Sequence, residues 1–248
     1  MLRIEADLHT HTVASGHAYS TVTEMARAAA EKGLKLIAIT DHGPAMPGGP
    51  HEYYFGNLSV LPEEIFGVRI LKGIEANIQS NGELDLPEKR LKQLDFVAAG
   101  IHRYAGYENT SKTEHTEATI RAIKNPLVKM ITHPANLYFP VDLLAVVQAA
   151  AEYGVILEVN ASSFDRFRLG KRGSKELSLK LCCLAKRYGV PLSLNSDAHF
   201  HRDVGNIETL SPVIKEAKLS ERDIINSSFD LVEAFISRKG AGRQRCVL

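Results

Sequence analysis

The chain has 248 residues, of which 24% are charged, and its formal net charge is +1. A charge so close to zero gives no overall field that would favour nucleic acid or a membrane surface as a partner, and no run of about 18 apolar residues is present to span a bilayer. Three cysteines, at Cys182, Cys183 and Cys246, provide neither a disulfide framework nor the spacing of a zinc ribbon. We therefore expect a cytoplasmic protein with one domain over residues 1–248.

Short apolar runs alternate along the chain with segments of helical period. Strands are predicted over residues 2–8, 34–40, 68–76, 94–101, 128–132, 155–160 and 191–196. Helices are predicted over residues 20–32, 114–124, 141–153 and 174–188. Because a helix or an irregular loop follows each predicted strand, the pattern indicates an α/β fold, a distorted (β/α)7 barrel of parallel strands. The long loops 43–57 and 162–173 both follow strands, and in such barrels these loops build the active face.

The first predicted strand leads into Asp7, His9 and His11. The two-residue period of a strand predicts that these three side chains point to one side, so that two imidazoles converge on one point. Imidazole nitrogen suits zinc, iron or manganese. A carboxylate next to a histidine ligand commonly orients its ring, and we assign that role to Asp7.

The other metal-capable side chains also come directly after apolar strands. In chain order they are His42, Glu75, His102, His133, Asp197 and His199. A single histidine after a strand is more often structural than a ligand. Because the carboxyl ends of parallel strands meet at one rim, the repeated coincidence favours a shared metal site.

In this order, the motifs DLHTH, ITDHG, GIEAN, AGIH, ITHP and NSDAH resemble the PHP (polymerase and histidinol phosphatase) superfamily, from Asp7 to about His199. Within it, the segment DLHTHTVASGHAYS with its additional His17 looks most like the YcdX-type phosphatases, which carry three metal ions. The resemblance implies a distorted seven-stranded barrel of the PHP type and a metal-dependent phosphatase that acts on a small phosphorylated substrate.

The resemblance also implies which side chains hold the ions, expected to be zinc, manganese or iron. The three sets are His9, His11, Glu75 and Asp197; Glu75, His102 and His133; and His17, His42 and His199. Glu75 would bridge the first two ions, and a bridging carboxylate allows two cations to lie about 3.5 to 4 Å apart around a shared phosphate.

The sequence contains no Ser or Cys in a nucleophile motif, so attack on phosphorus by metal-activated hydroxide is the simplest mechanism. Glu75 would hold the ions in place during this attack. The leaving oxygen would receive its proton from Asp197 or from a histidine such as His199, and the sequence leaves this choice open.

Basic residues follow two of the predicted strands and could bind an anionic substrate, because a guanidinium group presents a planar fork to phosphate. They are Arg103 after the fourth strand, and Arg166, Arg168, Lys171 and Arg172 after the sixth. A solvated loop residue is the competing interpretation for each. Three histidines with no strand before them are left out of the ligand set, namely His51, His115 and His201, and we expect His115 at the surface.

Three other interpretations remain open. An amidohydrolase-type barrel also begins with a His-x-His motif, but it bridges its metals with a modified lysine where this chain has Glu75, and it has no place for His17 or His42. A histidinol-phosphate phosphatase would differ only in substrate. A non-catalytic, metal-stabilised PHP module usually lacks ligands, whereas here every ligand position is filled. The sequence does not determine the native metal, the natural phosphoester or whether the chain forms an oligomer.

Overall fold

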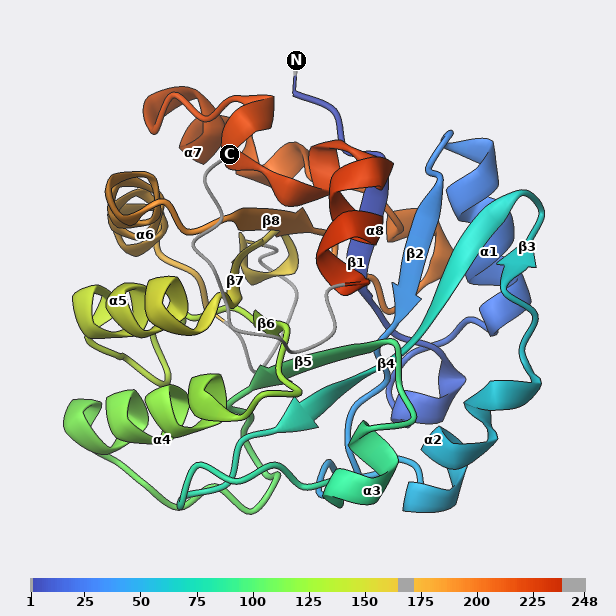
Figure 1. The fold of residues 1–248 in the computed structure, drawn as a ribbon, viewed down its shortest axis with the longest axis horizontal. Coiled ribbons are helices and arrows are strands. Elements are labelled where there is room, and N and C mark those ends of the chain that lie inside the picture. The colour runs from blue at the N-terminus through green and yellow to red at the C-terminus, as the bar shows by residue number, and fades with distance from the viewer. Residues whose placement is uncertain (1, 165–171, 238–248) are drawn as a thin grey trace.

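The computed structural model describes residues 2–164 and 172–237 (Figure 1). Seven parallel strands form one sheet in the order β1-β2-β4-β5-β6-β7-β8. They are β1 (Ala6–Thr10), β2 (Leu36–Ile39), β4 (Val68–Asn77), β5 (Phe96–Gly100), β6 (Met130–Ile131), β7 (Ile156–Asn160) and β8 (Leu192–Asn195). A short strand β3 (Glu64–Ile65) pairs antiparallel with β4. The sequence-based prediction of a distorted seven-stranded parallel barrel is confirmed.

The helices lie around the outside of the sheet, with α4, α5 and α6 side by side on one flank and α1 on the other (Figure 1). Four were predicted and begin at capping side chains: α1 (Val22–Glu31), α4 (Lys112–Lys124), α5 (Leu143–Tyr153) and α6 (Lys175–Tyr188). Four were not predicted: α2 (Glu52–Asn57), α3 (Glu88–Leu91), α7 (Ser211–Glu216) and α8 (Phe229–Ile236). Within the described residues, no helix is long and apolar enough to cross a membrane.

The barrel closes imperfectly between its first and last strands. The end of β1 meets the segment after β8 through an isolated parallel bridge between Thr10 and Ala198. At their other ends, the fully buried side chain of Asn226 lies between the two strands. Its amide donates to the carbonyls of Ala6 (2.8 Å) and Leu194 (2.7 Å) and accepts from the N–H of Leu194 (3.0 Å). The amide thus forms the hydrogen bonds that these backbone groups would have made with each other if β1 and β8 were paired along their whole length.

The start of β1 differs from its predicted position at residues 2–8. The N–H of Glu5 donates to the carbonyl of Asn226 (2.9 Å), and regular pairing with β2 begins at Ala6. β1 ends at Thr10, so it contains His9 and stops immediately before His11.

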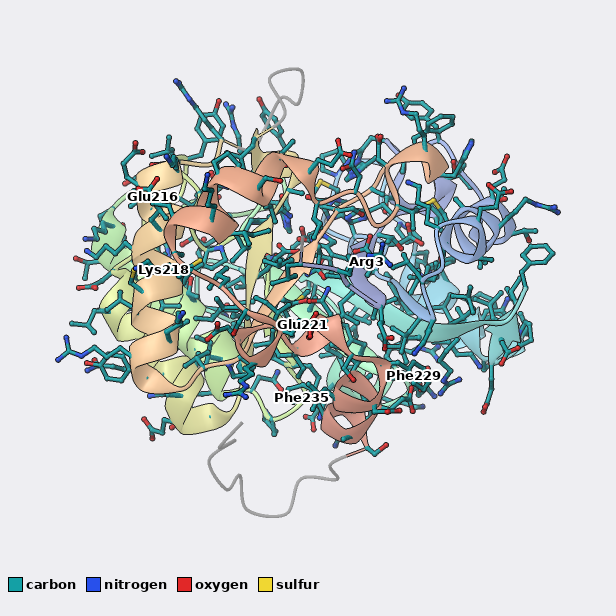
Figure 2. The ribbon with its side chains drawn as sticks, turned by 90° about the horizontal axis from the view of Figure 1, so that it is seen from above. Arg3, Glu216, Lys218, Glu221, Phe229 and Phe235 are labelled. Atoms are coloured by element: carbon teal, nitrogen blue, oxygen red, sulfur yellow. The ribbon has the colours of Figure 1, made fainter. Side chains whose placement is uncertain are left out.

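Along the inner face of the barrel, side chains change from apolar to polar toward the carboxyl ends of the strands. In β4 the same face carries Leu71 and then Glu75, and in β7 it carries Ile156 and then Glu158. The apolar half forms a buried cluster that α8 closes with residues such as Phe235 (Figure 2). The polar half is left at the end where the strand-following loops meet.

Candidate metal centre

The strand ends, together with the loop after β1 that carries His17, bring the nine predicted ligands into one cluster. Seven are buried, His199 is half-buried and His17 is exposed. Glu75, on β4, lies at the centre, and its two carboxylate oxygens face different imidazoles. Oε2 lies 3.1 Å from Nε2 of His9 and 3.0 Å from Nδ1 of His42. Oε1 lies 3.1 Å from Nε2 of His102 and 2.9 Å from Nε2 of His133.

The spacing around His9 and His11 fits a metal ion. Two ligand atoms each about 2.1 Å from one tetrahedral ion lie roughly 3.4 Å apart. Nε2 of His9 lies 3.0 Å from Nε2 of His11 and 3.6 Å from Oδ1 of Asp197. Nε2 of His11 lies 3.4 Å from Oε2 of Glu75 and 3.2 Å from Oδ1 of Asp197. The two imidazole nitrogens thus lie at ligand spacing from a carboxylate oxygen of Glu75 and from one of Asp197, as a divalent cation requires.

A second group of nitrogens lies beside this one. Nε2 of His102 and His133 are 3.2 Å apart, so both meet at the other oxygen of Glu75. The ligand atoms of His42, Glu75 and His102 also lie within 4.8 Å of one another. Two adjacent ion positions that share Glu75 are consistent with this arrangement.

The third predicted set is arranged less simply than the sequence suggested. The ring of His17 lies 5.0 Å from those of both His42 and His199, measured between centroids. However, it is His11 whose ligand atom lies within 4.8 Å of those of His42 and His199. His42 is also in contact with Glu75, so this imidazole stands between the third position and the other two.

Hydrogen bonds to Nδ1 fix the orientation of four of the histidine rings. In each of them Nδ1 lies next to an acceptor, which leaves the lone pair on Nε2. The pairs are His9 with Glu158 (2.7 Å), His11 with Ser15 (3.0 Å), His102 with Asn77 (2.8 Å) and His199 with the main-chain carbonyl of Asp197 (3.0 Å). Ser15 donates its own proton to Asp41, so its oxygen is free to accept from His11.

The role assigned to Asp7 is wrong, because the register of β1 shifts between Asp7 and Thr10 and breaks the expected alternation. Asp7 accepts hydrogen bonds from Ser196 and from the N–H groups of Gly205 and His9, and so fixes the loop after β8. The carboxylate that orients the ring of His9 is Glu158, which is also fully buried on β7.

The carboxylates give the centre a field that favours positive charge. Burial by itself would lower the pKa of His9, but Glu158, Glu75 and Asp197 raise that pKa well above its usual value. Burial likewise would raise the pKa of Glu158, whereas His9 holds it below the usual range. Because a divalent cation supplies positive charge at this position, the donor set and its electrostatics both suit such an ion.

Comparisons with known proteins place this arrangement in a family. A family model for the PHP domain matches residues 7–167. The chain is 48% identical over 239 residues to a Caldanaerobacter subterraneus protein named "probable phosphatase", a match covering 96% of this chain and 93% of that protein. A protein of Acetivibrio thermocellus with the same name is 44% identical over 239 residues and is covered to 97%. The chain belongs to the PHP domain family.

A solved PHP-type structure shares the fold. The histidinol phosphate phosphatase of Lactococcus lactis, determined with zinc, L-histidinol and phosphate, superposes with a TM-score of 0.58 over 87% of this chain and 94% of its own. Sequence identity is 16%. At this identity the likeness concerns the barrel and not the substrate.

Backbone strain in this PHP chain is found at the centre. His133 and Asp197 are non-glycine residues with positive φ angles of 34° and 53°. Such conformations cost about 1 to 3 kcal/mol each and persist where the surroundings enforce them, often at functional sites. Each residue lies two positions after the end of its strand, and both are candidate ligands, His133 next to Glu75 and Asp197 next to His11.

Asp41 is a buried hydrogen-bond hub that the sequence did not single out. Its carboxylate accepts from the N–H of Thr12 (2.7 Å) and from the hydroxyls of Thr12 (2.8 Å), Ser15 (2.6 Å) and Tyr54 (2.6 Å). Burial, together with the adjacent charge of Asp41, raises the pKa of Tyr54 and keeps its hydroxyl protonated. The hub thereby ties α2 and the turn after β1 to the ring of His11.

The remaining histidines lie outside the cluster. His51 caps α2, and His201 bonds Ser20. His115 is buried, and its Nδ1 lies 3.0 Å from the hydroxyl of Tyr107, so its predicted surface position is wrong. His115 lies on the face of α4 that packs against the loops after β5 and β6. This packing could not be read from the sequence alone.

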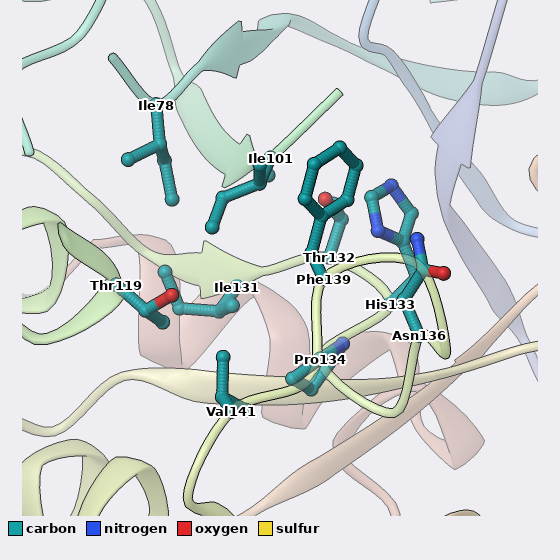
Figure 3. A pocket seen from close by; sticks show the side chains of 11 residues that line it. Ile78, Ile101, Thr119, Ile131, Thr132, His133, Pro134, Asn136, Phe139 and Val141 are labelled. Carbon is teal, nitrogen blue, oxygen red and sulfur yellow. The ribbon is translucent and has the colours of Figure 1, made fainter. Parts of the chain in front are cut away.

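Of the basic residues named from the sequence, Arg103 and Arg172 are described and exposed, whereas Arg166, Arg168 and Lys171 lie outside the described residues. A small pocket beside His133 is lined mainly by apolar side chains such as Ile78, Ile101 and Val141 (Figure 3). That lining does not suit a phosphate group.

Proposed function

We propose that this chain is a metal-dependent phosphatase that hydrolyses a small phosphomonoester at an ion cluster built around Glu75. The single observation that carries the proposal is the position of this fully buried carboxylate, with one oxygen facing His9 and His42 and the other facing His102 and His133. The relatives named "probable phosphatase" support the same activity over nearly the whole chain.

We infer three ion positions, held as the PHP resemblance implied. The sets are His9, His11, Glu75 and Asp197; Glu75, His102 and His133; and His17, His42 and His199. When bound, divalent ions lower the pKa of water and neutralise the charge that develops on a phosphoryl group. Zinc, manganese and iron all suit a set of imidazole and carboxylate donors.

The protein's own residues would orient the substrate and move its protons. Both oxygens of Asp197 are engaged, one by Asn160 (3.0 Å) and Ser162 (2.7 Å) and the other by the facing imidazoles. His199, with a side chain 14% exposed, lies nearer the exterior. His199 is therefore the more accessible of the two proton donors that the sequence left open, and it would have to leave the third ion before it could protonate the leaving oxygen.

Two alternatives are less well supported. The PHP ligand positions are all filled, which disfavours a non-catalytic module, and the bridging group is Glu75 and not a modified lysine, which disfavours an amidohydrolase. Histidinol phosphate is the alternative substrate that the PHP resemblance left open. Growth of a histidine auxotroph that expresses this chain would support that substrate, and failure to grow would disfavour it.

Glu75→Gln tests the proposed function. Glutamine keeps the shape of the side chain but removes the charge that offsets neighbouring cations, so kcat/KM for phenyl phosphate should fall at least about a hundredfold. Glu152→Gln, at an exposed position on α5, is the matched control and should retain full activity. Near-normal activity of Glu75→Gln, in protein shown by circular dichroism to be folded, would refute the role of Glu75.

A further inference from the structure

The loop after β5 holds an exposed cation beside the centre. Arg103 directly follows His102, and its guanidinium lies 5.3 Å from the ring of Tyr104 and 5.1 Å from the ring of Tyr138, measured to the centroids. Both distances are within the range of cation–π attraction, so two aromatic faces limit where the guanidinium can move. Within the described residues, Arg103 forms no ion pair with a carboxylate.

Tyr104 and Tyr138, here called the tyrosine clamp, come from the two loops that carry a pair of candidate ligands. Tyr104 lies on the loop after β5 with His102, and Tyr138 lies on the loop after β6 with His133. Loops that follow strands meet at one end of a parallel barrel, so Arg103 stands at the rim of the ion cluster. The Nε2 atoms of His102 and His133 lie 3.2 Å apart at Glu75, which brings the bases of the two loops together.

Tyr104 indicates that this arrangement is specific. It is a non-glycine residue with φ of 66°, a conformation that is uncommon for a bulky side chain. Its side chain is nevertheless 77% exposed, so burial of the ring does not compensate for the strain. In this conformation the ring lies 5.3 Å from the guanidinium of Arg103.

A second cation is attached to the same segment. The N–H of Leu137, next to Tyr138, donates to the carbonyl of Arg172 (2.9 Å), and Asn136 bridges Gly173. Arg172 is exposed. The segment 136–138 therefore contacts two arginines, Arg103 on the loop after β5 and Arg172 on the loop after β7.

We propose that Arg103 and its tyrosine clamp form a subsite for a second anionic group on the leaving-group side of the substrate, an inference that rests on the proposed phosphatase function. The phosphoryl group that is cleaved would belong at the buried cluster, whereas Arg103 is exposed at its rim and forms no ion pair in the part of the chain that the structure describes. A guanidinium held in place this way suits a planar carboxylate or a second phosphate. The substrate class is thus a phosphomonoester with an anionic leaving group.

The test compares two aryl phosphates that differ in charge and little in shape. In the metal-loaded enzyme, 4-carboxyphenyl phosphate should be preferred to 4-carbamoylphenyl phosphate. Arg103→Gln should lower kcat/KM about ten- to a hundredfold for the carboxylate and leave the carboxamide within about twofold, because a hydrogen bond between charged groups is lost only for the former. Arg27→Gln is the matched control. Arg27 lies on α1, away from the centre, and its guanidinium also contacts an aromatic ring, that of Phe66, at 4.6 Å from the centroid.

Binding gives a second measurement that does not depend on turnover. Calorimetry with (4-carboxyphenyl)phosphonate and (4-carbamoylphenyl)phosphonate should show the same selective loss in Arg103→Gln. The phosphonate that carries a second phosphonate group in place of the carboxylate then shows whether the subsite favours a carboxylate or a second phosphate. Equal losses for the charged and neutral compounds, or no loss for either, would overturn the subsite. If the wild-type enzyme hydrolysed neither aryl phosphate, the proposed function itself would fail.

Discussion

At the scale of single residues, the centre depends on acceptors that lie behind the imidazoles. The strand-end histidines could be predicted because each follows an apolar run, but their acceptors could not. Glu158 contacts His9 across 149 residues of sequence, and no local pattern links the two. Asp7, two residues before His9, was the expected acceptor, and a register shift in β1 turns it away.

Glu158→Gln tests this orienting role. The carboxylate accepts from Nδ1 of His9 (2.7 Å), the N–H of His133 (2.8 Å) and the amides of Asn160 (3.0 Å) and Asn195 (2.9 Å). A glutamine would place its own N–H groups against some of these donors and would make His9 a weaker base. We expect zinc affinity, measured by competition with a chelating dye, to fall about 10- to 100-fold.

Glu31→Gln, on the exposed face of α1, supplies the comparison for this experiment. If Glu158→Gln bound zinc as tightly as this control, the hydrogen bond to His9 would have no part in holding the ion.

At the scale of elements, strand ends could be located from the sequence to within a few residues, because apolar runs and helix caps mark them. The close approach of neighbouring strand ends could not be predicted from the sequence. A Cβ atom on Gly100, the last residue of β5, would lie 2.2 Å from Oγ1 of Thr132 and 2.9 Å from Cε1 of His133. Glycine at this position therefore lets β5 and β6 bring His102 and His133 together.

Gly100→Ala should separate this pair. Because the added methyl group meets the hydroxyl of Thr132, which directly follows β6, and the ring of His133, the imidazoles must shift. We expect the protein to lose about one equivalent of metal by elemental analysis and at least tenfold in kcat/KM. In Gly56→Ala, the new methyl group meets only the end of the flexible Arg90 side chain, and metal content should not change. Full metal content in folded Gly100→Ala would contradict this account of the strand ends.

At the scale of the whole molecule, the order of strands and helices was sufficient to predict the barrel, and the PHP motifs were sufficient to predict its polar end. The way in which the barrel closes was not predictable. Asn226 occupies the gap between β1 and β8 through contacts with residues 32 and 220 positions away. The apolar face of α8 covers the other end of the barrel from a segment where no strand-helix unit was expected.

The central claim is that one buried carboxylate and the surrounding histidines hold several ions, and elemental analysis of reconstituted protein tests it most directly. We predict two to three equivalents of zinc, manganese or iron in the wild-type chain. His17→Ala should contain about one equivalent less, because the exposed His17 is assigned to the third ion alone. Fewer than one equivalent in folded, reconstituted wild-type protein, or loss of all metal from His17→Ala, would contradict the proposed centre.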